Sequence, residues 1–220
     1  MKLNQRIINY WDNKYKVSNF KDFPSQFSSF VLNEIDNSYP IIDCGCGNGR
    51  DSIFFLKYNK VVYGLDSSVS SINLCKKKGG NFKKNSKFLI INFENKEDVS
   101  RLVKKFKKIN DNFNIYSRFF IHAISKKTEK NFLEFATMLC GRDGNIFLEF
   151  RAKKDCFIHK SFPGHFRRFI DIELFKGIVK NKDLKIKYII QGKGLAKYFS
   201  EDPYIARFIL KKNKSSVPSF

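Results

Sequence analysis

The sequence predicts an α/β domain built on a doubly wound, mostly parallel sheet. Apolar segments rich in β-branched and aromatic residues recur along the chain, and segments with helical start and stop signals separate the first five of them. A glycine-rich loop follows the first of these segments, and an acidic residue ends the second. Strands that alternate with helices form a parallel sheet covered on both faces, so this order favours a doubly wound fold.

Seven segments are predicted to be strands. The last two are joined by too few residues for a helical crossover, so we expect them to form an antiparallel hairpin that finishes the sheet. The sheet should therefore contain a final antiparallel strand. The predicted strands are residues 39–44, 60–66, 87–93, 113–121, 145–150, 184–192 and 204–212.

Four helices are predicted between these strands. The third has acidic residues in its first turn and lysines in its last, as the helix dipole favours. The second and the fourth stop at a glycine, which is a common helix terminator. The predicted helices are residues 50–59, 68–79, 95–109 and 125–141.

Two further helices precede the first strand, at 3–15 and 24–36, and Pro24 suits a helix N-terminus. In front of a doubly wound sheet, residues 1–37 would serve as an N-terminal helical lid. We predict a single domain over 1–212, followed by a flexible tail over 213–220.

Composition limits the class of protein. The chain has 220 residues, of which 42% are hydrophobic and 16% aromatic, enough for one packed core. No apolar run is long enough to cross a bilayer, and the first residues lack a signal-peptide core, so we expect a cytoplasmic protein without membrane insertion. The five cysteines lack the spacing of a disulfide scaffold. Cys44 and Cys46 are predicted to be buried thiols, and no metal site is expected.

The net charge of +21 raises the possibility of a nucleic-acid partner. The lysines are spread through the chain, however, whereas a nucleic-acid footprint is a localised face or stripe. We therefore do not expect nucleic-acid binding. A small anionic substrate needs fewer cations, placed together.

The loop "DCGCGNGRD" carries the most specific signal in the chain. Gly45, Gly47 and Gly49 would let the backbone turn sharply and approach a ligand closely. A dinucleotide fingerprint needs a third glycine where Arg50 stands, so the pattern is D-x-G-x-G-x-G instead. Asp66 ends the next strand, at a distance suited to a carboxylate that binds a ribose diol.

These motifs resemble those of the class I S-adenosylmethionine-dependent methyltransferases, which have a Rossmann-like fold. "DCGCGNGRD" is similar to the first motif of that family and "VVYGLDSS" to the second, and the resemblance covers nearly the whole chain. It implies that S-adenosylmethionine is the cofactor, with S-adenosylhomocysteine as product. The glycines would pack under its amino-acid part, Asp66 would bind the ribose hydroxyls, and Ser67 would lie beside the adenosine.

The same resemblance implies further cofactor contacts. Asn92 and Phe93 fall where the family places its adenine contact, usually an Asp followed by an apolar residue. Arg50 is a candidate for the cofactor carboxylate, and Asp43 belongs to the first motif. "YWDNKY" is similar to an N-terminal segment whose aromatics close over the cofactor, which makes Trp11 a candidate contact, with a simple core aromatic as the alternative.

Residues beyond the cofactor motifs indicate the chemistry of the acceptor. Methyl transfer needs alignment of donor and acceptor, and a base only where the acceptor loses a proton. The Asn/Asp-Pro-Pro-aromatic motif of family members that methylate amino groups is absent after the fourth strand, and "EDPY" (201–204) is interpreted as a turn. Arg118 and His122 are the polar residues of the fourth strand segment, and we expect them to face the reacting centre.

Residues 149–170 are interpreted as an insertion above the carboxyl ends of the strands. It holds the most localised positive cluster of the chain, interleaved with aromatic residues, although a solvated basic loop is the alternative. Arginines and histidines together suit a phosphate or similar anion. His122 or His165 would be the base for a hydroxyl acceptor. The candidate substrate-binding residues are Glu149, Arg151, His159, Arg167 and Arg168.

Several segments also resemble methyltransferases of bacterial surface-polysaccharide loci, including those linked to O-methyl phosphoramidate of the capsule. They are "LEFRAKKD", "HFRRFID" and "GKGLAKYFSEDPYIARFIL". This resemblance implies an O-methyltransferase that acts on a phosphoramidate, a phosphorylated nucleotide or a nucleotide-linked sugar. The alternatives are an RNA methyltransferase, a tellurite- or thiol-detoxifying methyltransferase, and a nucleotide-binding protein without catalysis. The oligomeric state is not predicted.

Overall fold

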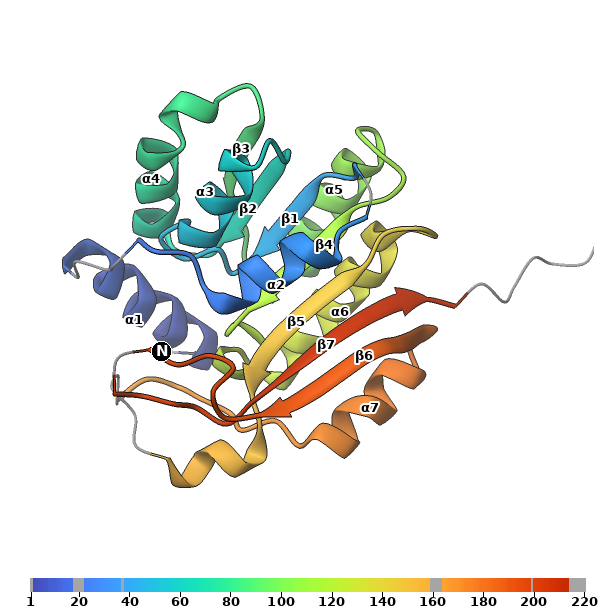
Figure 1. The fold of residues 1–220 in the computed structure, drawn as a ribbon. Helices are drawn as coiled ribbons and strands as arrows, with labels where there is room; N and C mark the ends of the chain where they lie inside the picture. Colours follow the sequence, from blue (N-terminus) through green and yellow to red (C-terminus); the bar gives the residue numbers. More distant parts are fainter. Residues whose placement is uncertain (1, 18–21, 37, 159–163, 199, 214–220) are drawn as a thin grey trace, which may run out of the picture.

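The computed structural model describes residues 2–17, 22–36, 38–158, 164–198 and 200–213, and it contains one seven-stranded sheet with helices on both faces (Figure 1). The strand order is β3-β2-β1-β4-β5-β7-β6. The strands are β1 (Ile41–Cys44), β2 (Val62–Asp66), β3 (Ser86–Ile90), β4 (Asn114–Arg118), β5 (Ile146–Arg151), β6 (Leu184–Gly192) and β7 (Ile205–Lys212).

Strands β1 to β5 are mutually parallel, and β7 runs antiparallel to both of its neighbours, β5 and β6. This confirms the predicted doubly wound, mostly parallel sheet with a final antiparallel strand. The hairpin folds so that β7 lies between β5 and β6, which leaves β6 at the edge. Burial explains this order, because the first six residues of β7 are buried, whereas β6 is mostly exposed or half-buried.

The four predicted crossover helices are present, with slightly shorter bounds. They are α3 (Arg50–Lys57), α4 (Val69–Lys78), α5 (Lys96–Lys107) and α6 (Lys126–Cys140). Ser68, Asn95 and Ser125 cap three of them, because each side-chain oxygen accepts a hydrogen bond from a backbone N–H in the first turn.

Helix α7 (Ile172–Lys180) was not predicted from the sequence. Its signals are nevertheless present. Asp171 caps its first turn by accepting hydrogen bonds from the backbone N–H groups of Glu173 and Leu174. Its buried side chains recur at helical spacing, and they are Ile172, Phe175 and Val179.

The two N-terminal helices, α1 (Leu3–Val17) and α2 (Gln26–Glu34), have different environments. Phe27 of α2 is fully buried and stacks on Tyr116 of β4, with ring centroids 5.1 Å apart. In α1 the only buried residue is Ile7. Helix α2 is therefore part of the core, whereas α1 lies on the surface beside α4 (Figure 1).

Three boundaries at the carboxyl ends of the strands differ from prediction, and β3 ends at Ile90 instead of residue 93. Strand β4 ends at Arg118 because Phe119 has a positive φ of 56°, and a 3₁₀ turn follows at Ile121–Ala123. Strand β5 continues to Arg151, which pairs with Ile205 of β7. The first three residues of the predicted insertion 149–170 therefore belong to the sheet. Of the predicted tail, all but Asn213 lies outside the described residues.

Candidate active site

A cavity of about 250 Å³ opens at the carboxyl ends of β1, β2, β4 and β5, and helix α1 contributes to its wall. This is where a doubly wound sheet binds its ligands. The cavity brings together residues of the glycine loop, the lid helix α1, and strands β4 and β5. It also includes residues of the predicted insertion after β5, which we call the basic segment. The predicted site residues that line it are Trp11, Asp43, Gly45, Gly47, Arg50, Asp66, Ser67, Arg118, His122, Arg151, His165 and Arg167.

The glycine loop needs its glycines for two reasons. All three have positive φ values, between 54° and 76°, which L-residues with side chains rarely adopt. A Cβ at Gly47 would also lie 2.4 Å from the hydroxyl oxygen of Tyr15, a residue of α1. Gly49 does not line the cavity; it caps α3, and a Cβ there would meet the Cys75 sulfur at 2.8 Å. The loop is thus a close-packed cradle that leaves backbone beside the cavity.

Asp66 holds this cradle against the end of β2. Its carboxylate accepts hydrogen bonds from the backbone N–H groups of Gly47, at 3.0 Å, and Ser68, at 2.9 Å. Burial raises the pKa of Asp66, and these backbone donors counteract the rise. A carboxylate fixed by the loop and open to the cavity, with Ser67 beside it, fits a ribose diol.

Asp43 and Arg50 are two ionisable residues next to the loop. The Asp43 carboxylate is buried and lies 2.6 Å from the hydroxyl of Ser52. Burial raises the pKa of Asp43 to about 8, although the Ser52 hydroxyl and the charge of Arg50 act to lower it. Arg50 lines the cavity with a largely buried side chain and fits an anionic group such as the cofactor carboxylate.

Asn92 and Phe93, the predicted adenine contacts, do not line this cavity. The side-chain oxygen of Asn92 accepts hydrogen bonds from the Asn4 amide, at 3.1 Å, and the Glu94 backbone N–H, at 3.0 Å. Phe93 is buried in the core, with its ring 5.2 Å from that of Phe135. Asn92 therefore touches α1, and Phe93 has a packing role.

Helix α1 closes the cavity with three aromatic residues, Tyr10, Trp11 and Tyr15. The ring of Trp11 stacks on that of Tyr15 at 6.1 Å and meets the ring of His165 edge-on at 5.0 Å. Tyr10 stacks on His165 at 5.2 Å. The lid therefore touches both the glycine loop and the basic segment, and it consists of α1 without α2.

Arg118 reaches the cavity from the end of β4 as part of a buried ion-pair network. Its guanidinium donates to one oxygen of Glu149, at 2.8 Å, and Arg207 donates to the other, at 2.7 Å. The Glu149 side chain is fully buried and does not line the cavity. Glu149 thus serves to fix Arg118 in place, since a buried carboxylate between two guanidinium groups has both its oxygens satisfied.

Arg151 forms a second network from the end of β5. It donates to Asp155 at 2.8 Å and is also paired with Glu201. The side chain of Phe119 lies between the two networks, with the guanidinium carbons of Arg118 and Arg151 at 4.2 Å and 5.2 Å from the ring centroid. The positive φ of Phe119 places this ring between the two arginines, in a strained backbone conformation typical of functional sites.

His122 is buried, and its Nδ1 accepts a hydrogen bond from the backbone N–H of Arg151 at 3.1 Å. A neutral imidazole that accepts at Nδ1 carries its proton on Nε2. Burial lowers the pKa of His122 well below its ordinary value, and the charges of Arg151 and Arg167 lower it further. His122 is consequently a hydrogen-bond donor and a weak base. His165, in contrast, accepts from Arg167 at 3.0 Å.

Arg168 points away from the cavity. Its guanidinium pairs with Glu129 and donates to the carbonyl oxygen of Ile121 at 2.8 Å, while its backbone N–H bonds to the carbonyl of His122. This arrangement ties the basic segment to α6 and to the turn after β4. His159 lies outside the described residues.

The connection between β6 and β7 contributes cavity residues that the sequence analysis did not identify. The "EDPY" segment was interpreted only as a turn, yet Glu201 and Pro203 line the cavity. No local sequence pattern marks them, because the partner of Glu201 in its ion pair is Arg151, which lies fifty residues earlier in the chain. The residues of this connection that line the cavity are Ala196, Tyr198, Glu201 and Pro203.

Cysteines and carboxylates do not form a metal site among the residues that the structure describes. Cys44 and Cys46 are buried free thiols, as predicted, and the sulfur of Cys46 lies 3.9 Å from that of Cys75. In the same described part of the chain, none of the helices has the length and apolarity needed to span a membrane.

Comparison with known proteins agrees with this geometry. Residues 35–139, which run from the end of α2 to α6 and include the glycine loop and Asp66, match a family model described as a methyltransferase domain. The chain contains a methyltransferase domain. A search of curated proteins gave no significant match to the enzyme.

Solved structures extend the likeness in fold to the whole chain. An S-adenosylmethionine-dependent methyltransferase from Anabaena variabilis has a TM-score of 0.73 at 17% identity, covering 97% of this chain and 96% of that one. A TehB-like methyltransferase from Corynebacterium glutamicum gives 0.61 at 13% identity, with 96% and 98% covered. Magnesium protoporphyrin IX methyltransferase from Synechocystis, with S-adenosylhomocysteine bound, gives 0.60 at 13% identity, with 97% and 88% covered.

Proposed function

We propose that this methyltransferase transfers a methyl group to an oxygen of a small anionic molecule. The acceptor class is a phosphoramidate, a phosphorylated nucleotide or a nucleotide-linked sugar, used as a cytoplasmic precursor of a bacterial capsule or other surface polysaccharide. The observation that carries the proposal is the cationic wall of the cavity, to which Arg118, Arg151 and Arg167 contribute. Guanidinium groups beside aromatic rings suit a planar or phosphate-like anion.

The residues of the chain divide the work between donor and acceptor. The glycine loop and Asp66 fit the donor, S-adenosylmethionine, which supplies an already activated methyl group when bound. Arg167 would hold the anionic acceptor, and Arg118, fixed by Glu149, would orient its reacting oxygen. Arg151, whose guanidinium is paired with Asp155 and Glu201, would line the acceptor pocket. Helix α1 covers the cavity and excludes water. Alignment of this kind can account for much of the rate enhancement.

The two histidines would have different roles in this scheme. An acceptor oxygen that already carries negative charge needs no base, and His122 would then donate a hydrogen bond from Nε2. For a neutral hydroxyl acceptor, His165 is the better candidate base, because burial and the neighbouring arginines disfavour protonation of His122 and lower its pKa. Arg167 would then have to turn from Nε2 of His165 toward the acceptor, so that this nitrogen is free to take the proton. The lid rings of Tyr10 and Trp11 would keep the His165 imidazole in place.

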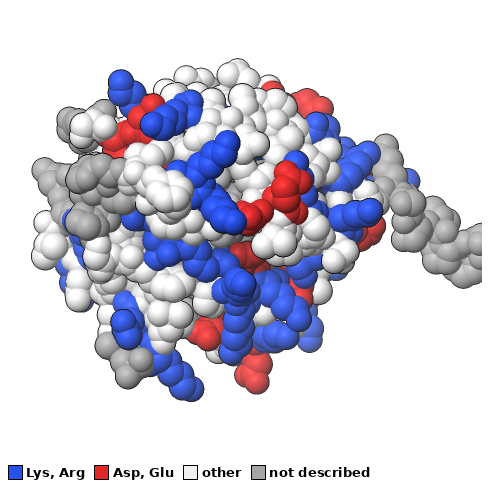
Figure 2. Space-filling view, turned by 90° about the horizontal axis from the view of Figure 1, so that it is seen from below, with Lys and Arg blue, Asp and Glu red and all other residues white. Residues whose placement is uncertain are grey.

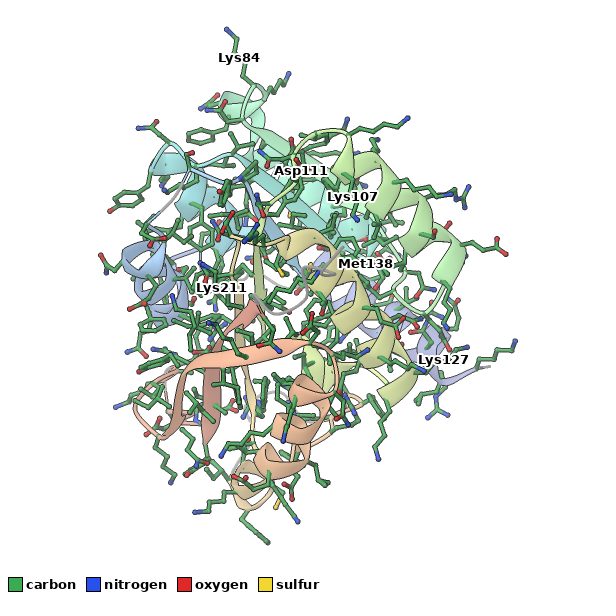
Figure 3. The ribbon with its side chains drawn as sticks, turned by 90° about the vertical axis from the view of Figure 1, so that its right-hand side faces the viewer. Lys84, Lys107, Asp111, Lys127, Met138 and Lys211 are labelled. Atoms are coloured by element: carbon green, nitrogen blue, oxygen red, sulfur yellow. The ribbon has the colours of Figure 1, made fainter. Side chains whose placement is uncertain are left out.

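The surface gives less support to an RNA acceptor. On the face shown in Figure 2, Lys and Arg occur in several separate groups, with acidic residues among them, and not as one continuous stripe. Other lysines lie far out on the surface, as Lys84 does in Figure 3. These side chains would be solvated, and they do not converge on the cavity.

The proposal is tested by turnover of the purified enzyme with phosphorylated nucleotides, nucleotide-linked phosphoramidates, nucleotide sugars, thiols and bulk RNA. We expect methylation of one of the anionic small molecules. Arg167→Ala should raise the KM for that acceptor about tenfold or more, while the affinity for S-adenosylhomocysteine stays unchanged. Turnover of RNA or thiols alone would exclude the proposal.

Arg168→Ala is the matched comparison. Arg168 lies next to Arg167 in sequence but is bonded to Glu129 and Ile121 outside the cavity. Its removal should lower the stability of the enzyme with little change in acceptor KM. Equal effects of the two substitutions on KM would mean that the charge of the segment, and not contact with the acceptor, is what matters.

A further inference from the structure

Asp12 lies next to Trp11 on the lid helix but does not line the candidate active-site cavity. One of its carboxylate oxygens accepts hydrogen bonds from the hydroxyl of Ser68 and the backbone N–H of Ser70, both at 2.8 Å. The other oxygen lies 2.9 Å from the ammonium of Lys16. The Ser70 N–H, Lys16 and Ser68 together hold the pKa of Asp12 well below its ordinary value. The carboxylate of α1 thus sits on the N-terminus of α4, where a negative charge is favoured.

The contact continues from Ser68 into the cofactor half of the site. The backbone N–H of Ser68 donates to one oxygen of Asp66, and the other oxygen of Asp66 accepts from the backbone N–H of Gly47. Ser68 also caps α4 through its hydroxyl, which accepts from the N–H of Ser71 at 3.0 Å. Asp12 is therefore linked through one residue, Ser68, to Asp66, whose carboxylate fits the ribose.

Helix α1 depends on such polar contacts because it buries little apolar surface. Ile7 is its only buried residue, and the core holds α2 far more firmly. The bond between Asn4 and Asn92 fixes the first turn of α1. In the middle of the helix, beside the aromatic lid residues, Asp12 accepts two hydrogen bonds from the N-terminus of α4.

We propose that Asp12 is a positioning residue that seats the lid helix on α4 and thereby controls cofactor affinity. Seating α1 places Tyr15 against Gly47 on the cofactor side, and it places Tyr10 and Trp11 against His165 on the other side. One helix thus completes both walls of the cavity, so binding of the cofactor favours the closed acceptor wall as well. This last consequence rests on the proposed function, whereas the effect on cofactor affinity does not.

The chain provides its own probe for this proposal, because Trp11 is its single tryptophan and lies on the lid. Asp12→Ala should weaken binding of S-adenosylhomocysteine about tenfold, equivalent to about 1.4 kcal/mol. It should also make the fluorescence of Trp11 more accessible to acrylamide. Asp12→Asn keeps an acceptor oxygen for Ser68 and should fall between Asp12→Ala and the wild type.

Two control variants distinguish loss of the contact between Asp12 and α4 from a general loss of charge. Lys16→Ala removes only the ion pair of the second oxygen, and Glu173→Ala removes an exposed acidic residue with a lysine partner on α7, away from the cavity. Both should keep wild-type affinity and quenching. Wild-type affinity and quenching in Asp12→Ala would overturn the proposal, as would an equal loss in all three alanine variants.

Kinetics with the identified acceptor give the final readout. Asp12→Ala should raise the KM for S-adenosylmethionine and for the acceptor, and saturating both should restore most of kcat. A fall in kcat with unchanged KM values would contradict a positioning role. Titrations with S-adenosylhomocysteine alone need no acceptor, so they test the lid seat even if the acceptor class proposed above is wrong.

Discussion

We propose that one half of the cavity, the cofactor half, binds S-adenosylmethionine and that the other, the acceptor half, binds the acceptor, and the two halves are built in different ways. In the cofactor half, residues 43–50 and 66–68 are joined by hydrogen bonds that involve backbone groups. Examples are the bonds that the Asp66 carboxylate accepts from the backbone N–H groups of Gly47 and Ser68. In the acceptor half, side chains that are distant in sequence form buried ion pairs. Glu149 joins Arg118 to Arg207, and Arg151 joins the end of β5 to Glu201.

This difference affects how each half tolerates change. A backbone cradle depends on the conformations that its few glycines permit, and substitution there affects ligand binding first. A buried network of charges depends on every partner being present, because removing one leaves another charge uncompensated in the interior. We therefore expect substitutions in the acceptor half to affect folding stability as well as activity.

Glu149→Gln is expected to have the largest effect on stability. It keeps the shape of the side chain but leaves the guanidinium groups of Arg118 and Arg207 without their shared carboxylate. Breaking a buried ion pair in this way costs about 3–5 kcal/mol. Urea unfolding of the wild type and the variant would measure the loss.

Glu173→Gln provides the matched control, because its pair with Lys176 is exposed on α7. Surface pairs of this kind contribute little to stability. If Glu149→Gln were no more destabilising than Glu173→Gln, the acceptor half would not depend on its ion pairs, and the contrast between the two halves would fail.

The same contrast explains which parts of the site could be predicted from the sequence. The glycine loop and Asp66 could be singled out because their pattern lies within residues 43–66, and the cofactor-binding role predicted for them stays a prediction. The fold was predictable for a similar reason, since each strand and crossover helix has its own local pattern. Helix α7 was missed, although Asp171 as a cap and the spacing of its apolar residues indicate a helix.

The acceptor half was predicted less accurately because charged residue types do not reveal their partners. Glu149 and Arg168 were expected to contact the substrate, yet both are engaged in ion pairs outside the cavity. Glu201 and Pro203 line the cavity from the "EDPY" segment, which was interpreted as a turn. Long-range pairing decides which charges stay available, and it becomes visible only in the folded chain.

Gly47→Ala should have the next largest effect, and on ligand binding more than on stability. The added methyl group would lie 2.4 Å from the Tyr15 hydroxyl, in a residue with a positive φ of 54°. Accommodating it requires Tyr15 and the loop to move apart. We expect binding of S-adenosylhomocysteine, measured by calorimetry, to weaken about 100-fold, equivalent to about 2.7 kcal/mol.

Gly80→Ala is the control for this substitution. A Cβ at Gly80 would meet no atom within 4 Å, and the residue lies at the far end of α4. Affinity should remain at the wild-type level. Retention of wild-type affinity in Gly47→Ala would show that the loop adapts more freely than its contact with α1 indicates.

The smallest expected effect concerns pH and comes from Asp43. Its folded-state pKa of about 8 lies above the ordinary 3.8, so between these values the native state holds a proton that the unfolded chain has lost. Stability from this group therefore falls as pH rises from about 4 to about 8. Asp43→Asn removes the titration while its side-chain oxygen can still accept from Ser52.

His122 acts in the opposite direction, because burial lowers its folded pKa, and its contribution to stability rises as pH increases toward its ordinary pKa of 6.5. Comparing the variant with the wild type cancels this contribution. The difference in unfolding free energy between Asp43→Asn and the wild type should grow by about 1 kcal/mol between pH 6 and pH 7. Parallel curves would mean that Asp43 is ionised in the native state, and that its buried carboxylate carries a charge beside the glycine loop.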